Sequence, residues 1–516
     1  MRARVLLVLS VVALGAAACT GDGTQDDEVD AGSPARSSPR ATQTGEEPGD
    51  EGAGAEAAEE TTEPPPGDPP EDVSAPAPEY PLYGVAYHFL AHVHAEPSKQ
   101  SEVVGHMRRG ARFRASERLA DEGCEDGWYA VPGGGHVCRG AGGYLLGREP
   151  RSFEPAPMPA ALEEPLPYVY GRVVRDDVPQ YWRLPSKEEE AAFARWLEAR
   201  DRTARATEPA TADAGPADGG AGVVATPDPD GGADGAVDAG DGRPDFVRLV
   251  MRRGFYVSID REAETEDGRR FIRTVRGTFV PEEAVAPAPP PPGPGVRVGR
   301  RHRLPLAFVF RDDATRWRIA PDTGALVRSG RFDRFEAFTA RQRVERGGRP
   351  FVVAPDGSLA RDTVVRIARA RTRPSRVPED GRWVHVDLSE QTLVAYEGDR
   401  PVYATLVSSG RRGFETPTGL WWIQSKHVTA TMDDLASEDP YLIEDVPWAM
   451  YFEGSYALHG AFWHRGFGRV RSHGCVNLAP EDAHWLFRWA TPSLPPSWHG
   501  VLTRGGRRTT HVLVEE

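Results

Sequence analysis

From residue 80 onward, hydrophobic and polar positions alternate over short distances, which is the pattern of β-strands rather than of helices. In the stretch 80–150, turn residues separate five such runs, at 87–93, 103–107, 112–118, 127–131 and 143–146. Several short strands with turn signals between them are typical of a small β-barrel. We therefore expect 80–150 to form one compact β-domain.

The middle of the chain continues the strand pattern with interruptions. We expect a second β-domain over 165–285, interrupted over 187–243 by a helix rich in Glu, Ala and Arg and then by an acidic linker. The proline-rich stretch 286–295 predicts a stiff, extended spacer. A further β-rich module is expected over 296–378, and no residue in it indicates a particular chemistry.

Residues 381–516 are expected to form a separate domain with one helix near its end. Pro480 suits the first helical position, and Glu481 and Asp482 suit the first turn. The apolar stripe of this helix consists of Ala483, Leu486, Phe487 and Ala490. Strands are predicted at 383–387, 392–396, 401–407, 420–424, 448–452, 456–458 and 511–514. The fold class is therefore mainly β with few helices.

The charge of the chain is unevenly distributed. The net charge is −15, but 22–79 contains 17 acidic and two basic residues, and 206–242 contains eight acidic residues and no basic one. Because 19–79 has almost no large apolar side chain, we expect a disordered acidic tether there. The rest of the chain is mildly basic. Such a body suits an anionic cell-wall polymer, and an ordinary solvated surface explains it equally well. We find no nucleic-acid-binding module.

The N-terminus has the composition of an export signal. Arg2 and Arg4 precede an apolar run at 5–14, and small residues at 16–18 form a cleavage site. The run is too short to span a bilayer permanently. Cys19 follows directly, which resembles a bacterial lipobox, although Ala16 stands where that motif usually has Leu. We expect 1–18 to be removed, Cys19 to carry a lipid anchor, and the protein to lie in the periplasm or cell envelope. Ordinary signal peptidase cleavage at the same bond is the alternative.

The stretch 80–150 resembles a bacterial SH3-like domain. The resemblance rests on His94-Ala95-Glu96-Pro97, Val103-Val104-Gly105 and the run 127–131. The end of the second β-domain, at 277–281, is similar to the end of the same fold. In an exported protein, Cys124 and Cys138 are expected to form a disulfide, and two free buried thiols are the alternative.

The stretch Ser472-His473-Gly474-Cys475-Val476-Asn477 carries the candidate chemistry. In an extended segment, His473 and Cys475 point to the same face, and Gly474 lets a substrate approach the backbone. A lone cysteine with histidines nearby is the composition of a thiol nucleophile. A buried structural cysteine is the simplest alternative. A zinc site is another, and its ligands would be His459, His464, His473 and Cys475. Their spacing fits no familiar zinc pattern, so we expect no metal and no cofactor.

This C-terminal region resembles the L,D-transpeptidase family with a YkuD-type catalytic domain, expected to be a β-sandwich or barrel. The residues that carry the resemblance are Val386-Asp387-Leu388-Ser389, Thr416-Pro417-Thr418-Gly419, His459-Gly460 and the stretch 472–477. The resemblance implies peptidoglycan stem peptides as substrates and a cysteine acyl-enzyme. Hydrolysis as an L,D-carboxypeptidase, attachment of a protein to the wall, and a non-catalytic wall-binding lipoprotein are the alternative functions.

The resemblance also implies roles for single residues. Cys475 is the nucleophile, His459 is the base oriented by the carbonyl of Gly460, and His473 and Ser472 support the site. Backbone N–H groups around Gly474 and Cys475 are expected to form the oxyanion hole. The residues alone do not decide whether His459 or His473 is the base. Further substrate contacts are expected from Tyr456, Trp463 and Asn477, although many members of the family have Arg in place of Asn477.

The segment 425–447 is longer than a hairpin turn and rich in carboxylates. We expect it to be a lid that attracts the amine of the acceptor. A solvated surface loop is the alternative. Its acidic residues are Asp433, Asp434, Glu438, Asp439, Glu444 and Asp445.

Overall fold

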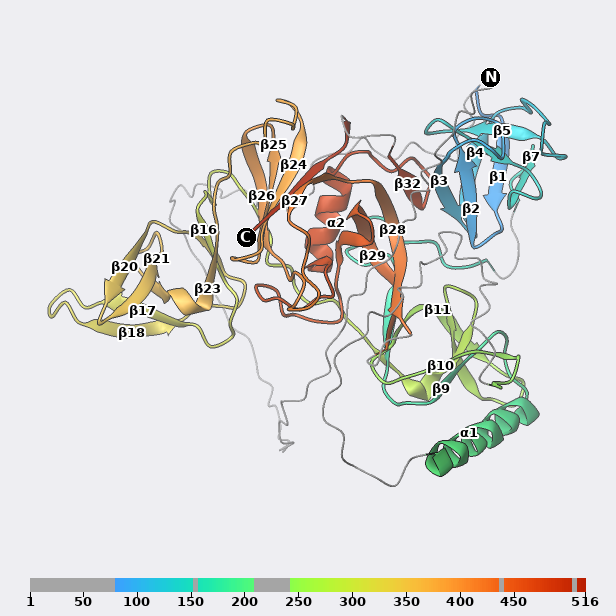
Figure 1. Cartoon of the computed structure of the whole chain (residues 1–516), viewed down its shortest axis with the longest axis horizontal. Helices are drawn as coiled ribbons and strands as arrows, with labels where there is room; N and C mark the ends of the chain where they lie inside the picture. Colours follow the sequence, from blue (N-terminus) through green and yellow to red (C-terminus); the bar gives the residue numbers. More distant parts are fainter. Residues whose placement is uncertain (1–78, 152–155, 208–241, 436–439, 504–507) are drawn as a thin grey trace, which may run out of the picture.

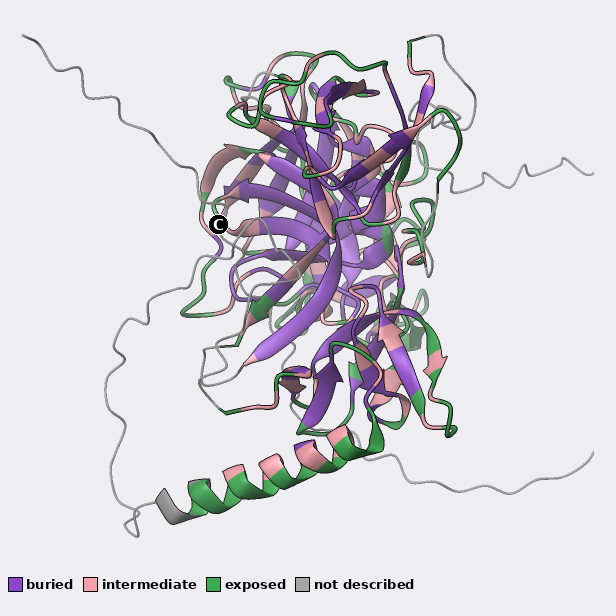
Figure 2. Ribbon diagram, turned by 90° about the vertical axis from the view of Figure 1, so that its right-hand side faces the viewer, coloured by how far each residue is buried: buried purple, intermediate pink, exposed green. Residues whose placement is uncertain are grey.

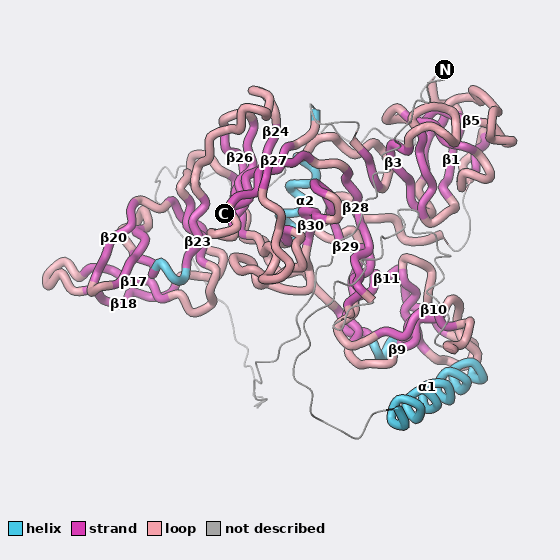
Figure 3. The backbone as a smooth tube through the Cα atoms, viewed as in Figure 1, coloured by secondary structure: helices cyan, strands magenta, loops and turns pink. Residues whose placement is uncertain are grey.

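The computed structural model describes residues 79–151, 156–207, 242–435, 440–503 and 508–516. The predicted signal peptide, Cys19 and the tether up to residue 78 lie outside the described residues, as does the linker over 208–241. The protein is mainly β, as predicted, and Figure 3 shows strands in all four regions and little helix besides α1 and α2. Neither of the two α-helices in the described ranges is long and apolar enough to cross a membrane.

The first module, residues 79–151, folds into two small sheets around one core. The sheets have the strand orders β4-β1-β7 and β3-β2-β6-β5. A disulfide joins Cys124 to Cys138 beside the buried ring of Trp128. The strands are β1 (Leu82–Ala86), β2 (Leu90–His94), β3 (Val103–Arg108), β4 (Arg112–Ala115), β5 (Trp128–Val131), β6 (Gly135–Cys138) and β7 (Tyr144–Gly147).

The second module, residues 165–287, is a curved sheet with an inserted helix, α1 (Lys187–Thr207). A capping box starts this helix, because Ser186 Oγ accepts from the Glu189 N–H and the Glu189 carboxylate accepts from the Ser186 N–H. Figure 2 shows that most of α1 is exposed. The strands are β8 (Val169–Val173), β9 (Val178–Tyr181), β10 (Val247–Met251), β11 (Tyr256–Glu264), β12 (Arg270–Thr274), β13 (Phe279–Pro281) and β14 (Val285–Pro287).

The third module, residues 296–378, lies at the left end of the molecule in Figure 1. It contains a three-stranded sheet, β19-β16-β23, and a five-stranded sheet, β18-β17-β22-β21-β20. Its first strand, β15 (Val296–Arg297), pairs with β26 of the following domain. The others are β16 (Leu306–Val309), β17 (Thr315–Ile319), β18 (Leu326–Arg331), β19 (Ala337–Thr339), β20 (Gln342–Arg346), β21 (Arg349–Val353), β22 (Leu359–Arg361) and β23 (Val365–Ala368).

The C-terminal domain, residues 381–516, packs two sheets against the helix α2 (Pro480–Trp489). One sheet has the order β26-β25-β24-β33-β27, and the other contains β28, β29, β30 and β31. Most of its strands are buried (Figure 2). The strands are β24 (Arg382–Asp387), β25 (Thr392–Glu397), β26 (Arg400–Leu406), β27 (Gly419–Trp422), β28 (Ser425–Asp434), β29 (Tyr441–Glu453), β30 (Tyr456–Gly460), β31 (Val476–Leu478), β32 (Gly500–Leu502) and β33 (His511–Glu515).

Strand pairing joins the C-terminal domain to both N-terminal modules. Strand β3 of the first module pairs with β32, and β11 of the second module pairs with β29. One sheet therefore runs through three of the four regions. The core of the first module also contains Trp498 and Val501, which come from the C-terminal domain. The first two modules and the C-terminal domain thus share one sheet, and the first module shares part of its core with the C-terminal domain.

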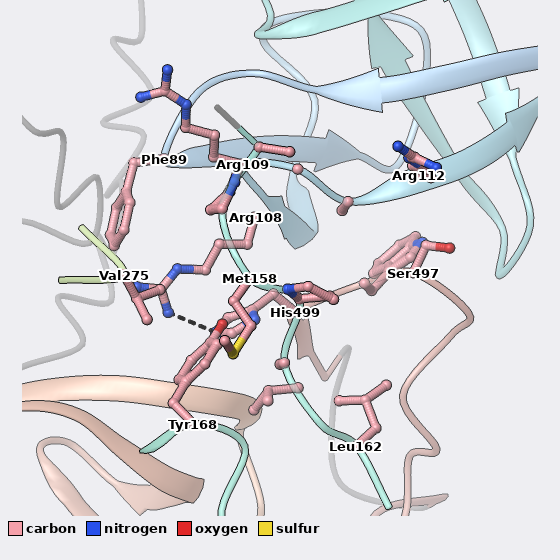
Figure 4. Close-up of a pocket in the computed structure, with 18 residues that line it drawn as sticks. Phe89, Arg108, Arg109, Arg112, Met158, Leu162, Tyr168, Val275, Ser497 and His499 are labelled. Carbon is pink, nitrogen blue, oxygen red and sulfur yellow. Dashed lines mark hydrogen bonds between the residues drawn. The ribbon is translucent and has the colours of Figure 1, made fainter. Parts of the chain in front are cut away.

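A cavity of about 480 Å³ lies where the first module meets the C-terminal domain. Figure 4 shows Arg108 of β3 next to Tyr168 and His499 in its lining. Met158 closes part of it from the segment that links the first two modules. None of Cys475, His459 and His473 lines this cavity, so it is separate from the candidate chemistry.

Candidate active site

The segment around Cys475 is a bend and not an extended strand. Strand β31 begins only at Val476, and Gly474 has a φ of +115°. The alternation expected for His473 and Cys475 therefore does not apply, because alternation requires extended backbone. A Cβ atom on Gly474 would lie 2.5 Å from the ring of Tyr456. Both its backbone conformation and this close contact require glycine.

Ser472 holds the bend closed from inside. Its Oγ donates to the Cys475 carbonyl at 2.5 Å and accepts from the Gly474 N–H at 3.1 Å. The Ser472 hydroxyl thus bridges the backbone of Gly474 and Cys475. The Gly474 N–H is used within the bend. In this structure the Gly474 N–H therefore does not serve as a donor of the expected oxyanion hole.

Thr416 fixes the same bend from a neighbouring loop. Its Oγ1 donates to the Gly474 carbonyl at 2.7 Å and accepts from the Gly410 N–H at 3.0 Å. Thr416 is buried. In the sequence, Thr416 stood out only as part of a stretch that carries the family resemblance, and the structure shows that its hydroxyl binds the residue before Cys475.

His459 is held in one orientation at the end of β30. Because a carbonyl oxygen only accepts, Nδ1 of His459 donates to the Gly460 carbonyl at 3.1 Å, which leaves Nε2 as the proton acceptor. The imidazole is fully buried and stacks against Trp463, with ring centroids 5.8 Å apart. Strand β30 runs parallel to β31, and His459 pairs with Asn477, two residues after Cys475. This geometry fits a general base.

His473 is bound differently. Its Nε2 lies 2.6 Å from a guanidinium nitrogen of Arg411. Since a guanidinium only donates, Nε2 is the acceptor and the ring proton is on Nδ1. Burial, together with the charge of Arg411, lowers the pKa of His473 to about 4. The ring contacts Phe414 edge-on at 4.1 Å and stacks with Tyr441 at 5.9 Å. The structure therefore favours His459 over His473 as the base.

Arg411 was not found by sequence reasoning. It lies on the loop before Thr416, and its N–H donates to the Ser472 carbonyl at 2.9 Å. Its guanidinium also lies over the ring of Phe414, 5.1 Å from the centroid. The adjacent Arg412 is exposed. Nothing in the sequence of this arginine pair indicates that one of the two reaches the site.

Cys475 is the only free cysteine in the described part of the chain, and it is fully buried. Its Sγ lies 3.8 Å from the carbonyl oxygen of Ser455. It belongs to a core cluster that also contains Tyr170 and Tyr256 of the second module. The second module therefore packs directly behind the nucleophile candidate.

The three expected substrate contacts have different positions. Tyr456 is half-buried and lies against Gly474, and Trp463 lies against His459. Asn477 is fully buried, and its side-chain nitrogen lies 3.0 Å from Nε2 of His464. Asn477 therefore orients a neighbouring imidazole inside the domain rather than facing open solvent.

The zinc alternative finds no support in the geometry. Within the described ranges, no three His, Cys, Asp or Glu side chains converge in a way that could hold a metal. His464 contacts Asn477, and burial lowers its pKa to about 3. His473 contacts Arg411, which is an unsuitable neighbour for a cation.

The expected lid is a long hairpin, and two of its carboxylates, Glu444 and Asp445, bind the N-terminal modules instead of facing the site. Residues 425–447 belong mainly to β28 and β29. Glu444 and Asp445 are fully buried and bind groups of the first and second modules. Glu438 and Asp439 lie outside the described residues. Tyr441 at the start of β29 does reach the site, where it stacks with His473.

Comparison with known proteins agrees with this geometry. Residues 381–501 match the YkuD family, described as the L,D-transpeptidase catalytic domain. Two curated relatives, L,D-transpeptidase 1 from two strains of Mycobacterium tuberculosis, are each 31% identical over 122 residues. The alignment covers 21% of this chain, and the chain spans only 46% of the length of these relatives.

Similar solved structures carry the same activity in their names. An L,D-transpeptidase from Mycobacterium smegmatis is 17% identical with a TM-score of 0.22, covering 43% of this chain and 90% of that one. One from Xylanimonas cellulosilytica is 25% identical with a TM-score of 0.20, covering 28% and 64%. The family match begins at residue 381, as the sequence predicted, and ends at residue 501, before β33. Residues 381–501 are a YkuD-type L,D-transpeptidase catalytic domain.

Proposed function

We propose that this protein is a peptidoglycan L,D-transpeptidase that uses Cys475 as its nucleophile. The observation that carries the proposal is the arrangement of His459. Its Nδ1 is bound by the Gly460 carbonyl, so Nε2 is an acceptor at the end of β30, beside the strand that follows Cys475. A base held in one tautomer, on a strand paired with the one that follows a lone thiol, supports activation of that cysteine by His459.

The reaction proceeds in two acyl transfers. His459 takes the proton of the Cys475 thiol, and Sγ attacks the carbonyl carbon of the third residue of a stem tetrapeptide. The bond to the terminal D-alanine breaks, and the proton passes from His459 to the leaving amine. An amine of a second stem then attacks the thioester, its proton goes to His459, and the Cys475 thiol is restored. Attack by water in this second step gives L,D-carboxypeptidase activity instead.

His473 supplies a donor rather than a base. Its Nε2 accepts from Arg411, so its Nδ1 carries the proton. This Nδ1 is buried and has no hydrogen-bond partner within the described ranges. Because an unmade hydrogen bond at a buried donor is costly, we propose that a carbonyl group of the bound stem peptide accepts it.

The location of the enzyme is part of the proposal. The N-terminal export signal and the lipobox-like position of Cys19 support a protein that is carried to the periplasm or cell envelope and anchored through a lipid. The acidic tether would let the catalytic domain reach peptidoglycan at a distance from the membrane.

The test is the intact mass of the protein after incubation with imipenem, which acylates thiol nucleophiles as a donor mimic. We expect one adduct on the parent and none on Cys475→Ala. The same two proteins are then given a stem tetrapeptide with an acceptor stem. A crosslinked product shows transfer, a tripeptide alone shows hydrolysis, and an unmodified parent in both assays would contradict the proposal.

A further inference from the structure

The third module holds twenty of the 62 lysine and arginine residues of the chain. Residues 296–378 contain twenty arginines and no lysine, against eight acidic residues. The catalytic proposal gives no role to this charge. In Figure 1 the five-stranded sheet of the module projects from the left end of the molecule, away from the first and second modules.

The register of the five-stranded sheet separates its arginines onto two faces. Directly paired residues of antiparallel strands point to the same side of a sheet. The pairs that define one side, the outer face, are Trp317↔Arg328, Trp317↔Leu359, Val353↔Leu359, Phe351↔Arg361, Val344↔Phe351 and Arg346↔Arg349. The outer face therefore includes Trp317, Arg328, Arg346, Arg349 and Arg361, and the apolar side chains of Phe351 and Leu359.

The inner face is different in both packing and charge. Val352 pairs with Ala360, and both belong to the core of the module. Arg343 pairs with Val352 and binds the Asp362 carboxylate. Arg318 also lies on this side and binds Asp356 at 3.1 Å. The charges of the inner-face arginines are therefore compensated within the module.

The arginines of the outer face have no such compensation. Arg328, Arg346 and Arg349 are exposed, and Arg361 is half-buried. None of the four has a carboxylate within ion-pair distance in the described part of the chain. The unneutralised charge of this sheet is thus concentrated on one side.

An aromatic surface lies between these arginines. Trp317 is half-buried and packs edge-on against Phe351, with centroids 6.3 Å apart. The guanidinium of Arg328 lies over the Trp317 ring at 5.6 Å. The indole N–H of Trp317 has no hydrogen-bond partner among the residues that the structure describes. This N–H is buried, so the outer face offers ligands the ring of Trp317 and the guanidinium groups rather than the indole N–H.

We propose that the outer face binds peptidoglycan, with its arginines on the carboxylates of stem peptides and Trp317 against the glycan. Guanidinium groups bind carboxylates through two parallel hydrogen bonds. This inference rests on the proposed function, since it places a second contact on the polymer that the catalytic domain is proposed to modify. A second contact on the same polymer raises the effective concentration of stem peptides at the catalytic site.

The test uses the full mature chain and purified peptidoglycan sacculi in a co-sedimentation assay. The variant Arg328→Gln with Arg349→Gln removes two charges from the outer face. The matched control, Arg318→Gln with Arg343→Gln, removes two charges from the inner face. We expect the outer-face variant to bind sacculi about tenfold more weakly at low salt. The inner-face control should bind within about twofold of the parent, once circular dichroism shows that both are folded.

Imipenem acylation separates this inference from the proposed function. Both double variants should acylate Cys475 like the parent, because the drug does not use the outer face. If the outer-face variant loses binding to sacculi but imipenem does not acylate even the parent, the outer face remains a binding surface. Only the enzyme proposal is then contradicted. Equal binding by the two double variants would overturn the inference. The inference would also be overturned if the outer-face variant lost binding to duplex DNA or anionic vesicles while its binding to sacculi stayed unchanged.

Discussion

Single residues outside the 472–477 stretch control its geometry. Thr416 bonds to the Gly474 carbonyl, and Arg411 bonds to both the Ser472 carbonyl and the His473 ring. The stretch 472–477 is thus held by the loop that contains Arg411 and Thr416. A cysteine in a bend with glycine at positive φ has little local preference for one conformation, so these contacts decide where the thiol lies.

We predict that Thr416→Val slows acylation of Cys475 about tenfold while the protein stays folded. The change keeps the shape of the side chain but leaves the Gly474 carbonyl and the Gly410 N–H without this hydroxyl, a loss of about 1 to 3 kcal/mol. The rate is measured from the time course of the imipenem adduct. Thr418→Val is the control, because Thr418 is exposed and should acylate like the parent. Equal rates for both variants would show that the bend does not depend on Thr416.

The two histidines should respond differently to pH and to substitution. Burial lowers the pKa of His473 to about 4, so this ring is neutral at higher pH and contributes no inflection between about pH 5 and pH 8. We expect His473→Gln to keep the pH profile of acylation and to raise KM for the stem peptide. His459→Gln should lower kcat by at least about 100-fold. A pH inflection that disappears in His473→Gln would contradict this assignment of roles.

At the scale of elements, the helix α2 is fixed at both ends by buried polar groups from other strands. Near its start, Asp482 accepts from Tyr403 at 2.8 Å and from the Gly295 N–H at 3.1 Å. The sequence placed Asp482 in the first turn without indicating its burial; in the structure it is fully buried, and burial raises its pKa to about 7. At the other end, Lys426 of β28 donates to the carbonyls of Phe487, Ala490 and Pro492.

We predict that Lys426→Met lowers the free energy of unfolding by about 3 kcal/mol. The change keeps an unbranched side chain but leaves three carbonyl groups at the end of α2 without their donor. Urea unfolding followed by tryptophan fluorescence measures the difference. Arg488→Gln is the control on the same helix, since the Glu163 partner of Arg488 is exposed and the change should alter stability by less than about 1 kcal/mol. A Lys426→Met protein as stable as the control would contradict this role.

At the scale of the whole molecule, Asp445 connects three regions through one buried carboxylate. It binds Arg108 of the first module at 2.6 Å, Ser258 of the second module at 2.5 Å and Thr429 of the C-terminal domain at 3.0 Å. Tyr170 also donates to its backbone carbonyl. The two N-terminal modules are therefore held against the catalytic domain by charge and hydrogen bonds as well as by strand pairing.

We predict that Asp445→Asn destabilises the protein by about 3 to 5 kcal/mol, because Arg108 would remain buried without its partner. Thermal unfolding measures the effect. The control is Glu117→Gln, which removes an exposed pair with Arg148 and should change stability by less than about 1 kcal/mol. Similar melting temperatures for the two variants would contradict the role of Asp445.

Because of the Asp445 carboxylate, the free energy of unfolding should also depend on pH. Burial opposes ionisation of Asp445, but Arg108 and Arg276 outweigh it and hold its pKa below the ordinary value. The folded state thus binds the proton less readily than the unfolded state. This stabilisation is complete above the ordinary pKa, about 4, and is lost as the pH falls through the lowered folded pKa. Asp445→Asn should remove this acid-dependent part.

Much of the fold and of the candidate site followed from the sequence alone. Period-two alternation predicted seven strands of the C-terminal domain but not β28, β31 or β32, and Pro480 with its apolar stripe predicted α2, because these signals are local. The stretch 472–477 and His459-Gly460 identified the family that the comparison then matched over 381–501. Strand alternation, helix signals and a short motif are formed by residues that are close together in the chain. They can therefore be recognised in a single sequence.

The tertiary structure decided what depends on residues far apart in the chain. The contact of Arg411 with His473, the burial of Asp445 and the entry of Trp498 into the first module's core link positions that no local pattern connects. The same limit explains the expected lid, since a carboxylate-rich segment has the same sequence pattern whether its acids face water or buried arginines. The cost of burying a charge depends on the partner that meets it, and only the folded chain supplies that partner.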